Sequence, residues 1–206
     1  MKHRIKQIVA ISGFMISITI LSCKDKKVTV ESNPQETKTT KDLSKDTTEI
    51  KQTVLSFYNW YGANWEKLTK YRLYQGENPP YKMNWSEVDR MHQYMRANVP
   101  QLGNEFISNQ KLFLRQTDSA FKQDVENEIP YNFDYDWYTN SQEDPMYLID
   151  ALNSSSSRWK YDVNGDDAMV EIKGKWLDET PDPPGTLMKL AMKKENGTWK
   201  ISRIGL

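Results

Sequence analysis

The sequence has very few of the side chains on which nucleophilic and metal-assisted catalysis depend. It holds 1 cysteine and 2 histidines among 206 residues. A disulfide needs two cysteines, so the fold must be stabilised by its apolar core, to which 7 Trp, 11 Tyr and 6 Phe contribute. Because the nitrogen and sulfur ligands that zinc prefers are scarce, we expect no metal and no cofactor.

His92 is the only histidine outside the N-terminal segment. A Ser-His-Asp or Cys-His mechanism would have to use it. It lies close to Arg90 and Gln93 in a stretch that we expect to be helical, and we predict that it is a solvent-exposed residue of that helix. The sequence therefore predicts no catalytic residues and a protein that is not an enzyme.

A large excess of charge of one sign is also absent. The chain has 28 basic and 28 acidic side chains, and residues 1–22 contain three of the basic ones and no acidic one. The chain beyond residue 22 is therefore slightly acidic. Domains that bind nucleic acid usually carry a basic patch, so we expect no nucleic-acid partner.

No apolar run is long enough for a membrane-spanning helix. The longest covers residues 8–21, whereas a spanning helix needs about 20 residues. A basic start, this short apolar run and the small residue Ser22 before Cys23 are the layout of a signal peptide. The residues Ile20-Leu21-Ser22-Cys23 resemble the lipobox of bacterial lipoprotein precursors. That resemblance implies cleavage before Cys23, attachment of fatty acids such as palmitate to it, and membrane attachment in the cell envelope.

A polar stretch separates this cysteine from the rest of the chain. Residues 24–46 contain no aromatic residue and cannot bury enough area to offset the entropy of ordering. We interpret 1–22 as a signal peptide, 23–46 as the lipidated cysteine with a disordered tether, and 47–206 as a single domain. An acid directly after the cysteine resembles an inner-membrane retention signal; Lys24 stands there instead, which favours the outer membrane.

The first half of the domain has helical periodicity. A helix beginning at Asp46 or Thr47 places five apolar residues on one face, and Gly62 is expected to end or loosen it. These five are Ile50, Val54, Phe57, Tyr58 and Tyr61. A second helix should start at Asn84 or Ser86 and end before Pro100. A third should cover residues 101–125.

The last fifty residues have the pattern of four strands, expected at 158–163, 168–177, 186–195 and 198–204. The dipeptides Asn164-Gly165 and Asn196-Gly197 are strong hairpin signals. Helices followed by an antiparallel meander predict an α+β fold.

Three segments resemble a family of uncharacterised bacterial envelope proteins with an NTF2-like domain. They are FYNWY at 57–61, DYDWYTNSQED at 134–144 and TWKISRI at 198–204. The resemblance implies an NTF2-like cone, in which N-terminal helices pack on a curved four-stranded antiparallel sheet and a pocket opens at one end.

Acidic and aromatic residues alternate in the second of these segments, which we take as the candidate pocket. Its residues are Asp134, Tyr135, Asp136, Trp137, Tyr138, Gln142 and Asp144, with Glu143 among them. Two carboxylates held close together could serve as an acid–base pair or bind a hard cation. Alternatively, the acids cap turns and helices while the aromatic residues close the core.

The expected function is that of a membrane-anchored envelope lipoprotein with a non-enzymatic domain that binds a protein or a small molecule. One alternative is an NTF2-like hydrolase or isomerase that uses Asp134 or Asp136, which requires both carboxylates in a deep pocket. A second is an immunity-type inhibitor of an envelope toxin. A third is a structural envelope component, which would expose a large apolar patch.

Overall fold

The computed structural model describes residues 40–205, except for 124, 127 and 176–184, with side chains from Leu43 onward. The predicted signal peptide, Cys23 and the tether up to residue 39 lie outside the described residues. The fold described below is therefore that of the expected domain and the few residues before it.

Helix α1 (Thr40–Leu68) begins earlier than its sequence pattern indicates. The prediction of a disordered tether is therefore wrong for residues 40–46. The physical reason lies in Asp46, whose carboxylate is buried and accepts hydrogen bonds from Lys194 and Trp199 of the sheet. These bonds hold the polar first turns of α1 in place, which periodicity cannot reveal. The apolar face predicted for this helix is confirmed, since all five of its residues are buried.

Gly62 does not end α1, contrary to prediction, and the helix continues to Leu68. A Cβ atom at position 62 would lie 2.5 Å from Cδ1 of Ile149 in α4 (Pro145–Asn153). A glycine inside a helix costs about 1 kcal/mol relative to alanine. Here the missing side chain allows the two helices to approach closely, so the position is a packing site.

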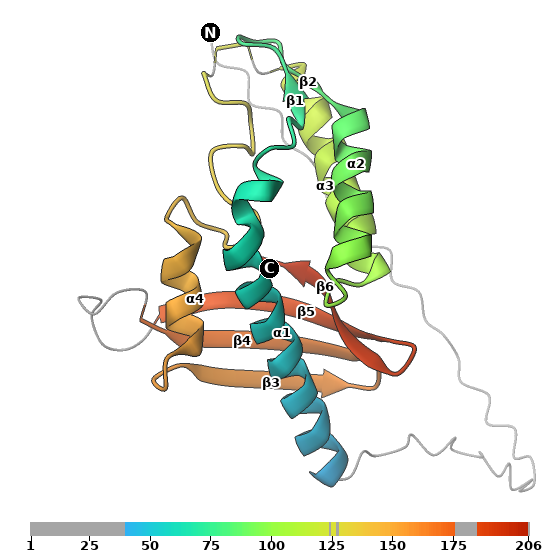
Figure 1. The fold of residues 1–206 in the computed structure, drawn as a ribbon, viewed down its shortest axis with the longest axis vertical. Coiled ribbons are helices and arrows are strands. Elements are labelled where there is room, and N and C mark those ends of the chain that lie inside the picture. The colour runs from blue at the N-terminus through green and yellow to red at the C-terminus, as the bar shows by residue number, and fades with distance from the viewer. Residues whose placement is uncertain (1–39, 124, 127, 176–184, 206) are drawn as a thin grey trace, which may run out of the picture. The chain divides into compact units, whose positions relative to one another are not determined.

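The C-terminal part is a four-stranded antiparallel sheet whose strands follow chain order (Figure 1). Its strands are β3 (Arg158–Asn164), β4 (Asp167–Gly174), β5 (Gly185–Glu195) and β6 (Thr198–Ile204). This confirms the predicted α+β class and the predicted meander.

Both hairpin signals mark turns. At the β5–β6 turn, Asn196 and Gly197 have φ values of 51° and 77°, as a two-residue hairpin of the favoured twist requires. At the β3–β4 turn, Asn164 is still paired with Asp167, so the turn begins one residue later, at Gly165.

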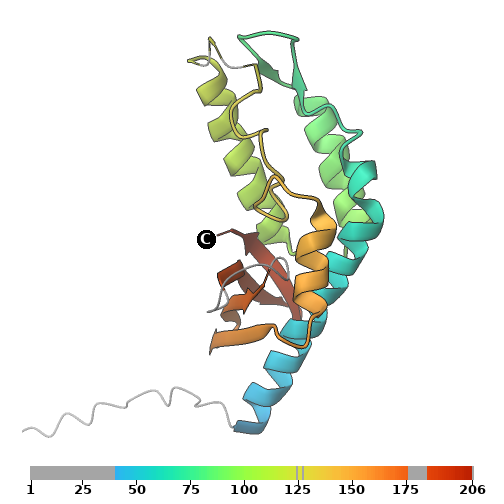
Figure 2. The ribbon, with the colours of Figure 1, turned by 90° about the vertical axis from the view of Figure 1, so that its left-hand side faces the viewer.

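One face of the sheet is covered by α1 and α4 (Figures 1 and 2). Strand β4 shows the pattern clearly, because Ala168, Val170 and Ile172 are buried while Met169 is exposed. In β6, Trp199 is buried against α1. The sheet is not curled, and the structure does not establish the expected NTF2-like cone.

Two further helices and a small hairpin complete the described part. The hairpin consists of β1 (Tyr74–Gln75) and β2 (Lys82–Met83), and the helices are α2 (Trp85–Asn98) and α3 (Asn104–Phe121). α2 lies where the sequence predicts it, whereas α3 begins three residues later and ends four residues earlier than the predicted range of 101–125.

Both helices contribute apolar residues to the core. Val88, Met91 and Met95 of α2 are buried, as are Phe106 and Phe121 of α3, whereas Leu102 and Phe113 are partly buried.

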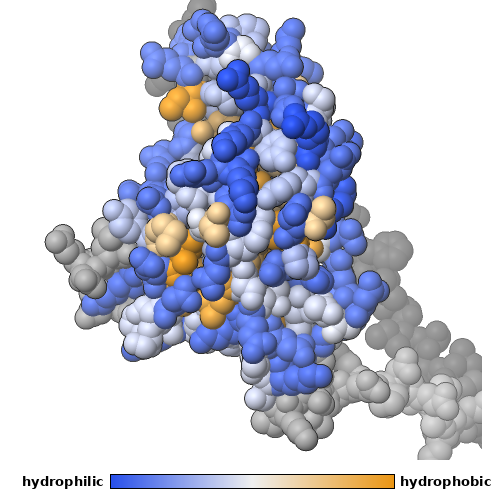
Figure 3. Space-filling view, in the orientation of Figure 1, coloured by the Kyte–Doolittle hydropathy of each residue, from blue (hydrophilic) through white to orange (hydrophobic). Residues whose placement is uncertain are grey.

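One face of the molecule shows little continuous apolar area. The face shown in Figure 3 is mostly hydrophilic, with small and separate apolar areas among its described residues. Large assembly contacts usually need a continuous apolar patch of several hundred Å². No helix among the described residues is long and apolar enough to cross a membrane.

Candidate functional site

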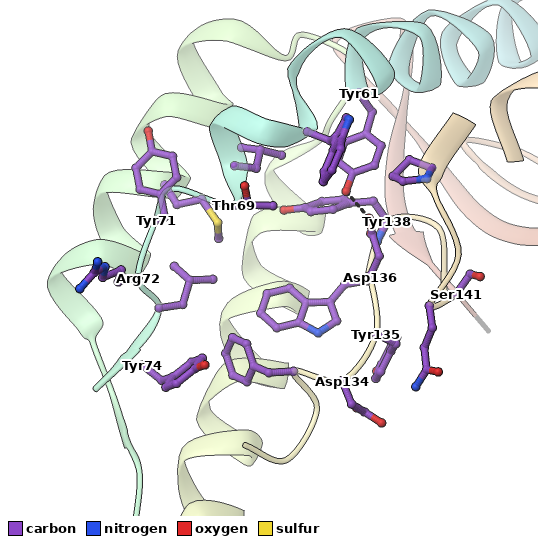
Figure 4. Close-up of a pocket in the computed structure, with 18 of the residues that line it drawn as sticks. Tyr61, Thr69, Tyr71, Arg72, Tyr74, Asp134, Tyr135, Asp136, Tyr138 and Ser141 are labelled. Atoms are coloured by element: carbon purple, nitrogen blue, oxygen red, sulfur yellow. Dashed lines mark hydrogen bonds between the residues drawn. The ribbon is translucent and has the colours of Figure 1, made fainter. Parts of the chain in front are cut away.

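A cavity of about 1070 Å³ lies among the described residues. Three segments form most of its walls: the last turns of α1, residues 69–77, and residues 133–145 (Figure 4). Asn84 and Met91 complete the lining. Eight aromatic side chains line it: Tyr61, Trp65, Tyr71, Tyr74, Phe133, Tyr135, Trp137 and Tyr138. A volume of this size suits a ligand at the upper end of the usual small-molecule range.

All seven residues of the predicted pocket line this cavity. They are Asp134, Tyr135, Asp136, Trp137, Tyr138, Gln142 and Asp144, and Glu143 lies with them. The structure thus brings the whole segment to one wall. The individual side chains nevertheless have different tasks, and some of them hold the segment together.

Asp136 closes a turn within this wall. Its Oδ1 accepts hydrogen bonds from the backbone amides of Tyr138, at 2.7 Å, and Thr139, at 3.2 Å. Its Oδ2 accepts from the hydroxyl of Tyr61 in α1. Burial, together with the nearby Asp136 carboxylate, raises the pKa of Tyr61 well above its usual value, so the tyrosine remains a donor. Asp136 therefore fixes the wall to α1.

The other predicted carboxylates do not join Asp136 in a buried pair. Asp134 is exposed. Asp144 is the N-cap of α4, and its Oδ1 accepts a hydrogen bond of 2.8 Å from the amide of Met146. The hypothesis of an acid–base enzyme required Asp134 and Asp136 together in a deep pocket, and this geometry does not provide that pair. The helix that Asp144 caps was missed from the sequence, although an Asp-Pro pair is a recognised start signal.

Tyr138 joins the cavity wall to the helical core. Its ring is buried, and its backbone carbonyl accepts a 2.9 Å hydrogen bond from the hydroxyl of Tyr58. Its own hydroxyl accepts a 3.0 Å bond from Gln110 Nε2 and contacts the sulfur of Met95 at 3.4 Å. Burial raises the pKa of Tyr138, which keeps the hydroxyl protonated.

His92 extends this network and corrects a prediction. It is 2 % exposed, not a solvated helix residue, and its Nε2 lies 3.0 Å from Gln110 Oε1. Because Gln110 uses its Nε2 to donate to Tyr138, its Oε1 is the acceptor and His92 Nε2 carries the hydrogen. Burial lowers the pKa of His92, so the neutral ring is favoured. The histidine supports the core beneath the wall and does not line the cavity.

The opposite wall was missed by sequence reasoning. It is formed by residues 69–77, which show no regular period, and it includes Tyr71, Arg72 and Tyr74 (Figure 4). The ring of Tyr74 lies 4.9 Å from that of Phe133, and Phe133 lies 5.0 Å from Trp137, both edge to face. The density of aromatic residues on either side of Gly76 was the available signal.

Several polar groups in the wall have no partner among the described residues. They are the indole N–H of Trp65 and the hydroxyls of Tyr71, Tyr74 and Tyr135. By contrast, the indole of Trp137 donates a 2.6 Å hydrogen bond to the carbonyl of Asn132. Half-buried rings with unused donors are the usual features of a site that binds organic molecules.

A smaller cavity of about 220 Å³ lies beside α3 and β6. It shares Tyr135, Trp137 and Tyr138 with the larger one. These three residues therefore form a partition with a cavity on each side.

The comparisons with known proteins give no family. No protein-family model, no curated protein and no solved structure matches this chain. Within the described residues, no group of three or more histidine, cysteine, aspartate or glutamate side chains is arranged to hold a metal ion. The chemistry of the aromatic cavity is therefore the guide to function.

Proposed function

We propose that this chain is a bacterial envelope lipoprotein, anchored by lipid on Cys23, whose domain binds an organic ligand in the aromatic cavity. The observation that carries the proposal is the cavity of about 1070 Å³ with eight aromatic side chains in its walls. Aromatic rings contribute large contact areas, and pockets lined in this way with a few polar groups usually bind small molecules or peptide segments.

The wall formed by residues 133–145 is fixed in place before a ligand binds. Asp136 ties residues 136–139 to α1 through Tyr61, and Tyr138 ties them to α3 through Gln110. A wall that is already fixed loses little conformational entropy when a ligand binds. In a merely structural wall, the polar groups would be satisfied within the protein. The donors of this wall that have no partner among the described residues therefore favour a binding role.

Fluorescence titration of the purified chain with Nile red, a neutral apolar dye, tests the proposal. Saturable binding is expected, and Trp65→Ala or Tyr74→Ala should weaken it at least tenfold. Tyr147→Ala is the matched control, because Tyr147 is 43 % exposed on α4 and does not line the cavity. Circular dichroism should show that the variants remain folded. Absence of saturable binding, or equal weakening by Tyr147→Ala, would exclude the cavity as the site.

A further inference from the structure

The wall of the large cavity is unbalanced in charge. Five carboxylates line it, against the single basic side chain of Arg72. They belong to Glu77, Asp134, Asp136, Glu143 and Asp144. A cleft lined by charges of one sign concentrates the field and attracts ligands of the opposite sign.

Three of these carboxylates are unused by the fold. Those of Asp136 and Asp144 accept hydrogen bonds from backbone amides. Those of Glu77, Asp134 and Glu143 are exposed and form no hydrogen bond or ion pair with a described residue. These three exposed side chains, which we call the rim carboxylates, are therefore available to a ligand.

Arg72 does not neutralise this rim. Its guanidinium forms no ion pair with a described residue, and Figure 4 shows it on the wall opposite Asp134. The imbalance between the carboxylates and the single cation thus remains in the folded protein.

The rings offer a second attraction for positive charge. A cation above the face of an aromatic ring gains about 0.5–1 kcal/mol at an exposed site and about 2 when it is desolvated. The protein itself provides an example, since the guanidinium of Arg90, which does not line the cavity, lies 5.8 Å from the ring centre of Tyr71. Trp65 and Tyr74 have no such cation over them among the described residues.

We propose that the ligand of this cavity is an organic cation, an inference that rests on the proposed binding function. Its apolar body lies against Trp65 and Tyr74, and its ammonium or guanidinium group pairs with an exposed carboxylate of the lining, from Glu77, Asp134 or Glu143. A free amine and a lysine or arginine side chain of a peptide share this chemistry.

Isothermal titration with three probes of nearly equal size tests the charge of the ligand. The probes are 2-phenylethylamine, 2-phenylethanol and phenylacetate, which are cationic, neutral and anionic at pH 7. The amine should bind at least tenfold more tightly than the alcohol, and phenylacetate should bind most weakly. The advantage of the amine should shrink as salt is added, because the rim is exposed and therefore screened.

The triple variant Glu77→Gln/Asp134→Asn/Glu143→Gln tests whether the rim carboxylates cause the preference for the amine. It should reduce the advantage of the amine to less than threefold and leave alcohol and Nile red binding unchanged. The matched control removes three exposed carboxylates elsewhere, through Glu66→Gln, Asp150→Asn and Asp162→Asn, and should preserve the advantage.

The outcomes separate the two proposals. Equal binding of amine and alcohol, or an advantage that survives in the rim variant, overturns the cation proposal while Nile red binding still supports the cavity. The same holds if Nile red binds and none of the three probes does.

A blocked Lys-Phe-Lys peptide distinguishes the two sources of the cationic group. Tighter binding than the amine indicates a polypeptide ligand, and weaker binding indicates a free amine.

Discussion

The indole of Trp199 donates a 2.8 Å hydrogen bond to the carboxylate of Asp46, which lies 153 residues earlier in the chain. Both side chains are buried, at 1 % and 4 % exposure. The same carboxylate oxygen accepts a 2.7 Å bond from Lys194. The first turns of α1 are thus attached to β5 and β6 by one buried acid.

Replacing Asp46 with Ala should destabilise the domain by about 2–4 kcal/mol, because it leaves an indole donor and a largely buried ammonium without this acceptor. Asp46→Asn should cost less, since the amide oxygen can still accept from Trp199. Urea denaturation measures both free energies of unfolding. Glu49→Ala is the control on the same helix, where the 3.7 Å contact with Lys45 is exposed and should contribute under about 0.5 kcal/mol. Equal effects of Asp46→Ala and Glu49→Ala would contradict the assignment.

Gly62→Ala should destabilise the domain by about 1–3 kcal/mol, although alanine is the better helix former. The new Cβ would meet Ile149 Cδ1 at 2.5 Å and force α4 away from α1. Thermal and urea unfolding give the size of the loss.

Ile149→Val removes the atom that the new Cβ would strike. In a double-mutant cycle, this substitution should cost less in the Gly62→Ala background than in the native one. Additive costs would show that close packing is not the reason for the glycine.

Acidification should destabilise the domain through His92. Burial holds its folded-state pKa below the usual value of about 6.5, so the unfolded chain binds a proton first as the pH falls. The stability due to His92 is complete above about pH 6.5 and is lost as the pH drops through the range between the unfolded and folded pKa values. His92→Gln should therefore show a smaller loss of unfolding free energy between pH 7.5 and pH 5.5. An unchanged loss would mean that other groups cause the pH dependence.

Cys23→Ala should abolish incorporation of radiolabelled palmitate in cells, because no other cysteine exists in the chain. Membrane fractionation should show the variant released from the membrane pellet. Ser44→Ala is the control outside the lipobox and should be labelled like the native chain. Label that persists in Cys23→Ala would refute the lipoprotein assignment.

Local patterns predicted much of the fold. The apolar spacing from Ile50 to Tyr61 and the Asn196-Gly197 pair each depend on residues close in sequence, and both predictions are confirmed. The α+β class and the strand order followed from them.

Features set by distant neighbours were not predictable in this way. Gly62 is explained by Ile149, and the burial of His92 is explained by Gln110 on another helix. In the candidate site, the wall at residues 133–145 was found because its acids and rings are concentrated in one segment. The wall at residues 69–77 was not found, since irregular backbone has no period that indicates where its side chains point.

Helix α1 is continuous from the first described residue, Thr40, to the turns that line the cavity. At about 1.5 Å of rise per residue, Thr40 lies about 32 Å along α1 from Tyr61. α1 therefore sets a fixed distance between its own N-terminus and the cavity. Insertions or deletions before Thr40 would leave that distance unaltered.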